Sequence, residues 1–205
     1  MIKIIDYGLG NILAFGNMYK RLNVDVGIAR TADELDGATG LILPGVGAFD
    51  HAMELLDASG MRQRLDEMVL ADKLPVIGIC VGMQILANGS DEGSARGLGW
   101  IDGQVRALAT LKPGMMLPHM GWNDVRPMSD TPVLAGLQTG ARFYFLHSFY
   151  FHCNDPTNVA AVSNYGTDFS CAVHRGNIYG VQFHPEKSHH FGARLLQNFA
   201  ERVAC

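Results

Sequence analysis

Apolar positions in the first half of the chain alternate between short runs and longer segments with helical spacing. The short runs predict strands over residues 2–6, 24–29, 40–43 (ending at Pro44) and 76–79. Helical spacing occupies residues 11–21 and 49–70, and a further helix begins within 83–87. Strands that alternate with helices in this way predict a mostly parallel sheet flanked by helices.

From about residue 97 the pattern changes to shorter alternating pieces. They predict antiparallel strands and hairpins over residues 103–108, 143–150, 159–163, 171–174 and 178–183. Residues 190–203 place Phe191, Leu195, Leu196 and Phe199 at helical spacing, which predicts a closing helix. Because no repeat or hydrophilic linker divides the chain, we expect residues 1–205 to form a single α/β domain, with a mostly parallel central sheet and an antiparallel part in the second half.

Composition narrows the classes of function. With 205 residues, 48% hydrophobic and 18% charged, and a mean hydropathy of +0.08, the chain is too rich in core-forming residues to be disordered. A net charge of −4 without any basic run disfavours nucleic acid and membrane surfaces as partners. An acid at Asp6 and the lack of an 18-residue apolar run predict a cytoplasmic protein.

The four cysteines lie far apart and form no CxxC pair: Cys80, Cys153, Cys171 and Cys205. This spacing suggests neither a disulfide framework nor a zinc site, and no spacing of ligands implies a metal or an organic cofactor. Cys153 and Cys171 lie in or beside apolar runs and are expected to be spectators.

Cys80 is the exception because it lies in Gly78-Ile-Cys-Val-Gly82, between a buried strand and a helix. A G-x-C-x-G corner is typical of a nucleophile elbow, where the glycines avoid collisions and the nucleophile adopts a strained backbone conformation. Helix amides beside the sulfur favour a thiolate, and the amide of Val81 faces any oxyanion formed there. The alternative is that Cys80 is a small buried apolar residue.

A nucleophilic thiol needs a base that a third group orients, and His184 is the best placed of the eight histidines. It directly follows the predicted strand 178–183 and is fixed by the next residue, Pro185, with Glu186 available to hold its tautomer. Thiol and imidazole would then share the edge of the sheet at which ligands of open α/β sheets bind. From spacing alone, a capped strand end with a surface His and Glu remains open.

Two glycine-rich turns are further candidates. Leu41-Ile-Leu-Pro-Gly-Val-Gly47 ends a predicted strand and suits an oxyanion hole better than a phosphate site, because the P-loop pattern and a nearby lysine pair are missing. Tyr7-Gly-Leu-Gly-Asn11 lacks the third glycine of a dinucleotide fingerprint, since Leu13 occupies its place. The soft stretch Met115–Trp122, interrupted by Pro118, suits either the core or an adaptable contact with another protein.

Three segments carry a resemblance to a known family: Gly78-Ile-Cys-Val-Gly-Met-Gln84, Pro44-Gly-Val-Gly-Ala-Phe49 and Gly180-Val-Gln-Phe-His-Pro-Glu-Lys-Ser188. With these motifs, the chain resembles the class I (triad) glutamine amidotransferases, and the resemblance extends from Met1 to the last helix. The fold of that class is flavodoxin-like. Three further segments resemble the family of glutaminase subunits of imidazole glycerol phosphate synthases: Asp6–Asn11, Pro118-His-Met-Gly-Trp-Asn123 and Tyr144-Phe-Leu-His-Ser148.

The resemblance implies that Cys80 attacks the side-chain amide of L-glutamine and that His184 and Glu186 complete a triad. A glutamyl thioester is then hydrolysed to glutamate, and ammonia passes through a tunnel to a cyclase subunit with a (β/α)8 barrel that acts in histidine biosynthesis. The oxyanion hole would use the amides of Val81 and Gly47. The positions that match glutamine-binding residues of the family are Gln84, Glu92, Ser148 and the backbone at Phe149.

The resemblance also implies where the partner docks. The matching positions at the subunit contact or the tunnel mouth are Asn11, Met120, Trp122, Tyr144 and Lys187. Phe149 and Trp100 depart from the usual residues of the family and suit a paralogue that supplies ammonia to a cyclase-like synthase for surface-polysaccharide amidino sugars. A stand-alone cysteine hydrolase and a non-catalytic flavodoxin-like binding module also remain open.

Overall fold

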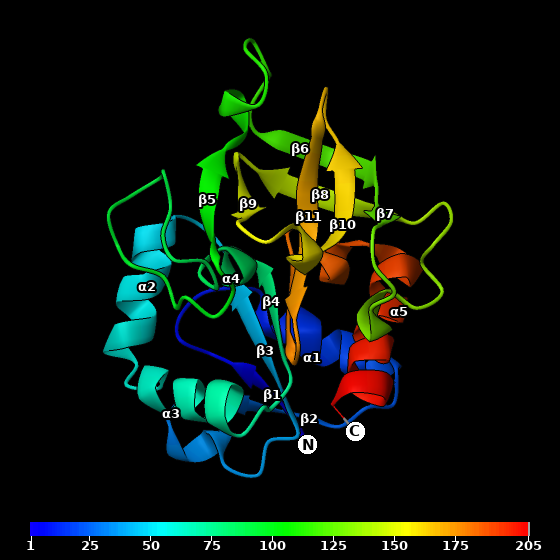
Figure 1. Cartoon of the computed structure of the whole chain (residues 1–205). Coiled ribbons are helices and arrows are strands. Elements are labelled where there is room, and N and C mark those ends of the chain that lie inside the picture. The colour runs from blue at the N-terminus through cyan, green and yellow to red at the C-terminus, as the bar shows by residue number, and fades with distance from the viewer. Residues whose placement is uncertain (205) are drawn as a thin grey trace.

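A computed structural model describes residues 1–204, so Cys205 lies outside the described residues. Its centre is an eight-stranded sheet in the order β2-β1-β3-β4-β12-β11-β10-β7 (Figure 1). The first five strands in that order pair in parallel: β2 (Val26–Ala29), β1 (Ile2–Ile5), β3 (Gly40–Gly45), β4 (Val76–Cys80) and β12 (Ile178–Val181). The other three pair antiparallel: β11 (Asp168–Arg175), β10 (Val159–Asn164) and β7 (Arg126–Pro127).

Helices cover this sheet on both sides. In Figure 1, α2 (Phe49–Ala58) and α3 (Arg62–Asp66) lie to the left of the strands, and α1 (Ile12–Arg21) and α5 (His189–Asn198) lie to the right. The Tyr19 hydroxyl donates a hydrogen bond to the Leu196 carbonyl at 3.2 Å and so joins α1 to α5. Single π-helical turns extend α3 over Glu67–Ala71 and α5 over Phe199–Val203.

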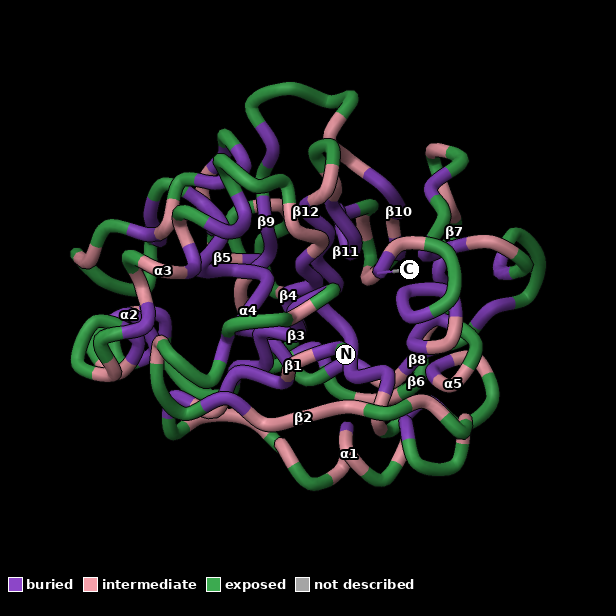
Figure 2. Tube along the Cα trace, turned by 90° about the horizontal axis from the view of Figure 1, so that it is seen from below, coloured by how far each residue is buried: buried purple, intermediate pink, exposed green. Residues whose placement is uncertain are grey.

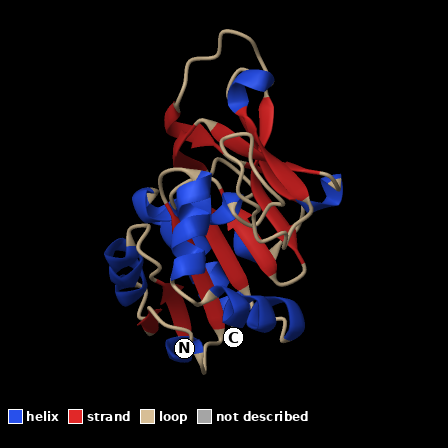
Figure 3. Cartoon of the chain, turned by 90° about the vertical axis from the view of Figure 1, so that its left-hand side faces the viewer, coloured by secondary structure: helices blue, strands red, loops and turns tan. Residues whose placement is uncertain are grey.

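Two small antiparallel sheets lie beside the antiparallel strands of the central sheet, in the upper part of the molecule in Figure 1 and in Figure 3. In one, β5 (Gly103–Ala107) pairs with β9 (Phe149–Cys153), and in the other β6 (His119–Asp124) pairs with β8 (Arg142–His147). Short 3-10 turns complete the described structure: Asp33–Leu35, Leu108–Thr110, Pro132–Leu134, Pro156–Asn158 and Pro185–Lys187. The predicted α/β class with an antiparallel part is therefore confirmed.

Several predicted boundaries are wrong, each for a local reason. The helix predicted over 49–70 breaks after Ala58, where Gly60 takes a left-handed φ of +71° and the Ser59 hydroxyl bonds back to the Leu56 carbonyl. The strand predicted over 143–150 is two strands, since β8 ends at His147 and β9 begins at Phe149 in a different sheet. Both breaks send the chain in new directions without interrupting the apolar pattern.

Near the elbow, β3 continues past its predicted end to Gly45. The helix expected within 83–87 is instead a single turn, α4 (Val81–Gln84), that starts directly after Cys80. Strand β12, expected among the antiparallel pieces, is parallel to β4 on one side and antiparallel to β11 on the other. It is therefore the strand at which the two halves of the sheet meet.

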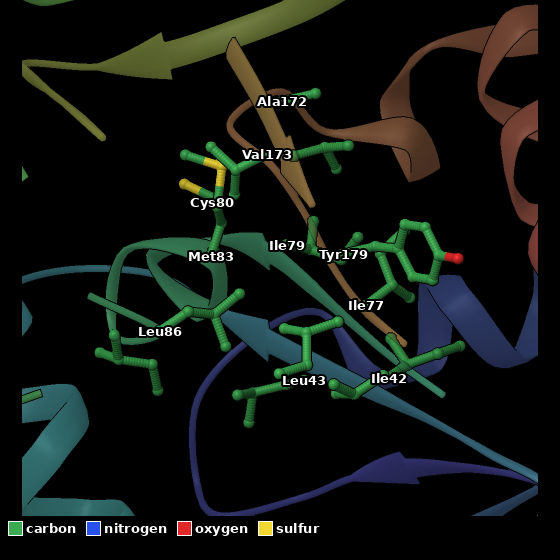
Figure 4. Close-up of a cluster of buried hydrophobic side chains, with 14 of the residues drawn as sticks. Ile42, Leu43, Ile77, Ile79, Cys80, Met83, Leu86, Ala172, Val173 and Tyr179 are labelled. Atoms are coloured by element: carbon green, nitrogen blue, oxygen red, sulfur yellow. The ribbon is translucent and has the colours of Figure 1, made fainter. Parts of the chain in front are cut away.

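The core is centred on β3 and β4, in which every residue is buried (Figure 2). Ile42 and Leu43 of β3 lie beside Ile77 and Ile79 of β4, with Met83 and Leu86 near them (Figure 4). Each such aliphatic side chain contributes roughly 1.5–3 kcal/mol on burial, so the strands that carry the candidate site are anchored in the core. Within residues 1–204, no helix is both long and apolar enough to cross a membrane.

Candidate active site

Three neighbouring parallel strands end side by side at one edge of the sheet. Gly45 of β3 lies opposite Cys80 of β4, and Ile79 of β4 lies opposite Val181 of β12. The turn after β3, the elbow after β4 and the segment after β12 consequently meet at this edge. Carboxyl ends of parallel strands are where ligands bind in open α/β sheets.

The backbone at Cys80 has the strain expected of an elbow, with φ +56° and ψ −114°. A Cβ on Gly78 would lie 2.5 Å from the Gly82 carbonyl oxygen, and one on Gly82 would collide with the Leu43 carbonyl oxygen. Both glycines are thus required by close backbone contacts, as the spacing predicted. Because α4 is one turn long, its dipole is small.

His184 lies against Cys80 and is held from behind by Glu186. The His184 Nδ1 and Glu186 Oε1 atoms are 2.9 Å apart, and the two side chains are only 6% and 3% exposed. Burial opposes the charged imidazolium, but hydrogen bonds with Cys80 and Glu186 outweigh it and raise the pKa of His184 to about 9. The hydrogen bonds with Cys80 and Glu186 therefore favour the charged imidazolium of His184 at neutral pH.

Glu186→Gln is expected to lower the pKa of His184, because burial would then act with less opposition from a negative partner. Because the pKa of His184 is higher in the folded than in the unfolded protein, protonation of His184 stabilises the fold. This stabilisation is complete below about pH 6.5 and is lost as the pH rises through about 9. The free energy of unfolding of the wild type should therefore fall over that window, and fall less in the variant. Urea titrations at several pH values measure this, with exposed Glu201→Gln as the control; equal slopes in all three proteins would contradict it.

A pocket of about 320 Å³ opens at Cys80 and His184. Every residue predicted to bind glutamine or the oxyanion lines it: Gly47, Val81, Gln84, Glu92, Ser148 and Phe149. Glu92 is also fixed through Oε2, which accepts a hydrogen bond from the Phe49 amide at 2.9 Å. The size of the pocket suits a small polar metabolite.

Gln182 and His147 are two site residues that we did not predict. Gln182 is fully buried, and its Nε2 donates to Cys80 Sγ at 3.7 Å. His147 lines the pocket beside Ser148. The signal for Gln182 was a polar residue inside the apolar run Val181–Phe183. His147 was not predicted because the sequence did not reveal the strand break at Ser148.

The residues predicted for the subunit contact lie at or near the same edge. Met120 and Trp122 point outward from β6 and are 65% and 41% exposed. Trp122 stacks on His189 with ring centroids 5.2 Å apart, and Lys187 Nζ lies 5.6 Å from the centre of the Tyr144 ring. Asn11 caps α1, its side chain accepting from the Ala14 amide at 3.3 Å.

A thiol, an imidazole and a carboxylate lie in sequence at the pocket, because Cys80 and His184 line it and Glu186 contacts His184 from behind. Among residues 1–204, no group of three or more His, Cys, Asp or Glu side chains is arranged to hold a metal ion. Cys80, Cys153 and Cys171 are free and buried, and of these Cys80 alone lines the pocket.

Known proteins are similar to this chain in sequence, and others are similar to it in fold. Imidazole glycerol phosphate synthase subunit HisH of Bdellovibrio bacteriovorus is 62% identical over 203 residues, covering 98% of this chain and all of that protein. The HisH subunit of Leptospira borgpetersenii is 50% identical over 202 residues, covering 98% and 99%. A crystal structure of a glutamine amidotransferase superposes with a TM-score of 0.77 at 21% identity, covering 99% of this chain and 98% of that one, which supports the fold alone.

The family pattern of class-I glutamine amidotransferases matches residues 3–203, which is nearly the whole chain. The relatives match from end to end, and their names place them in one family of synthase subunits. The chain therefore belongs to the class-I glutamine amidotransferases and, within them, to the family of imidazole glycerol phosphate synthase subunit HisH.

Proposed function

We propose that this chain is the glutaminase subunit of an imidazole glycerol phosphate synthase and supplies ammonia for histidine biosynthesis. The observation that carries the proposal is a strained Cys80 elbow in contact with a buried His184–Glu186 pair at a small pocket. Membership of the class-I glutamine amidotransferases supports L-glutamine as the substrate, and membership of the HisH family supports histidine biosynthesis as the pathway.

In the proposed reaction, the Cys80 thiolate attacks the side-chain amide carbon of glutamine. The C–N bond then breaks, and His184 gives its proton to the leaving nitrogen, which departs as ammonia. Water, deprotonated by the same imidazole, attacks the resulting thioester and releases glutamate with a free thiol. Glu186 keeps the imidazole oriented and stabilises its charged form.

The negative oxygen of the tetrahedral intermediates needs amide donors beside the sulfur. The amide of Val81 follows the nucleophile directly, and Gly47 lines the pocket from the turn after β3. Gly47 has a φ of +89°, a conformation open to glycine, so the peptide before it can turn its N–H toward the site. Glu92, Gln84, Ser148 and Phe149 would hold the amino-acid end of glutamine.

A partner that covers the pocket is supported by the apolar rim around it. Five exposed hydrophobic residues lie in the segments around the pocket: Val46, Leu117, Met120, Trp122 and Leu146. Clustered exposed apolar side chains mark protein contacts. We propose that a cyclase subunit with a (β/α)8 barrel docks here, because ammonia released at Cys80 must reach a second active site without loss to water.

Met120→Asp is expected to weaken binding of the cyclase subunit by about tenfold or more, because a charge would be buried against an apolar partner. Titration calorimetry with the purified cyclase measures this effect. Met128→Asp is the matched control, since Met128 is 58% exposed and lies just after β7, away from the pocket residues. Equal losses in both variants would contradict docking at β6.

Glutamate release tests the function itself. The wild type should turn over glutamine when the cyclase and its phosphoribosyl substrate are present, with Cys80→Ala as the blank. Turnover that does not depend on this cyclase would favour the paralogue in amidino-sugar synthesis, and no turnover under any condition would favour a binding module.

Trp100 gives no support to the paralogue, because its indole is fully buried and its N–H donates a hydrogen bond to Asp66 at 2.6 Å, which is a packing role.

A further inference from the structure

A pair of buried histidines lies beside the pocket and has no part in the reaction above. His119 of β6 and His147 at the end of β8 are 3% and 6% exposed. His119 Nδ1 is 2.9 Å from His147 Nε2. Two imidazoles in direct contact inside a protein require a defined arrangement of protons.

The groups at the two ends of the pair determine that arrangement. His147 Nδ1 lies 2.7 Å from the Phe149 carbonyl oxygen, which can only accept, so Nδ1 carries a proton. At the other end, the Asn123 amide nitrogen lies 3.2 Å from His119 Nε2 and 2.8 Å from the Asn164 carbonyl oxygen. An amide nitrogen carries two N–H groups and cannot accept, so it donates one hydrogen bond to the carbonyl and the other to His119 Nε2.

Both rings are therefore neutral, and all hydrogen bonds run in one direction. His119 accepts at Nε2 and donates from Nδ1, and His147 accepts at Nε2 and donates from Nδ1 to Phe149. Burial lowers the pKa of His119 to about 4 and that of His147 to about 3. A positive charge on the nearby His184 lowers the pKa of His147 further. His119 is also stacked between Phe145 and Tyr165, with ring centroids 4.7 and 4.2 Å away.

The Phe149 carbonyl oxygen connects the histidine pair to a residue of the pocket. It accepts a second hydrogen bond, at 3.4 Å, from Gln84 Nε2, which also donates to Gln182 Oε1 at 3.0 Å. Both N–H groups of the Gln84 amide are used in this way, so Gln84 presents its oxygen as an acceptor. An acceptor at this place suits the ammonium group of an amino acid.

We propose that His119 and His147 are a positioning pair that holds the Phe149 carbonyl, and through it Gln84, in the orientation that binds glutamine. The pair also links this wall of the pocket to β6, whose outer face carries Met120 and Trp122. The inference rests on the proposed function, because it takes glutamine as the ligand. The pair acts on binding and not on the chemical step, since neither ring is hydrogen-bonded to Cys80.

Kinetics of the complex with the cyclase test the proposal. His119→Phe keeps an aromatic ring in the stack but leaves His147 Nε2 without its donor, so we expect KM for glutamine to rise about tenfold with kcat within about twofold. His119→Asn places an amide N–H near the position of Nδ1 and is expected to restore KM to within about twofold. An unchanged KM in His119→Phe, or equal defects in both variants, would overturn the pair's role.

A measurement without turnover covers the case in which His119→Phe folds poorly. ¹⁵N-histidine NMR of the wild type at pH 6 should show both rings neutral with the proton on Nδ1, and a charged ring or a proton on Nε2 would overturn the arrangement. Glutamine binding to Cys80→Ala by calorimetry separates the two proposals. If glutamine neither binds nor turns over, the proposed function fails; if it does either and KM is unchanged in His119→Phe, only the pair's role fails.

Discussion

Cys80→Ala is expected to reduce glutamine hydrolysis by about four orders of magnitude or more while the fold and cyclase binding remain. Loss of the nucleophile removes the covalent route, and the remaining groups of a triad contribute little without it. Alanine is smaller than cysteine and no more strained at φ +56°, so the elbow keeps its shape. Glutamate release measured in the loaded complex gives the rate, and circular dichroism verifies the fold.

The matched control is Cys171→Ala. Cys171 is fully buried in β11, and burial raises the pKa of its thiol well above the usual range, so it stays protonated and unreactive. The variant should retain turnover, and iodoacetamide should label Cys80 but not Cys171 in the folded protein. Turnover that survives Cys80→Ala would remove Cys80 from the mechanism.

Gly82→Ala is expected to cost about 3 kcal/mol or more of unfolding free energy, the largest effect on stability that we anticipate. The new methyl group would overlap the Leu43 carbonyl oxygen, and backbone atoms of the buried strand β3 cannot move aside without disturbing its neighbours. The midpoint of urea unfolding measures the loss. Activity should fall as well, because the elbow carries Cys80.

Gly16→Ala is the control for this substitution. Gly16 lies within α1, and a Cβ there would meet no atom within 4 Å. Alanine favours the helix over glycine, so the variant should be more stable by roughly 0.5–1 kcal/mol. If Gly82→Ala were as mild as Gly16→Ala, the close approach of the elbow to β3 would not be a requirement of the fold.

The sequence was most informative where local pattern and packing agree. Continuous apolar runs predicted β3 and β4, and the glycines around Cys80 predicted an elbow that the structure contains. The family and the fold that the motifs implied are confirmed by the relatives. The catalytic and binding roles of Cys80, His184 and the pocket residues remain predictions, which the variants above test.

What could not be predicted depends on contacts between distant segments. β6 was missed because its inward positions carry His119 and Asn123, which are satisfied by His147 and by the Asn164 carbonyl rather than by an apolar neighbour. Gln182 contacts Cys80 across 102 residues of sequence. Polar groups of this kind look like surface residues until their partners are known.

The position of β12 has a consequence for how such proteins diverge. His184 follows the strand at which the parallel sheet becomes antiparallel, and Cys80 follows the neighbouring parallel strand. The neighbouring strands β4 and β12 therefore bring nucleophile and base together, and the Tyr144 carbonyl of β8 accepts a hydrogen bond from the His184 amide at 2.9 Å. The exposed Met120 and Trp122 lie on β6, in a separate small sheet. Substitutions on the outer face of β6 can refit the surface to a new synthase while its inward residues and the catalytic register stay unchanged, so one glutaminase can be adapted to many acceptors.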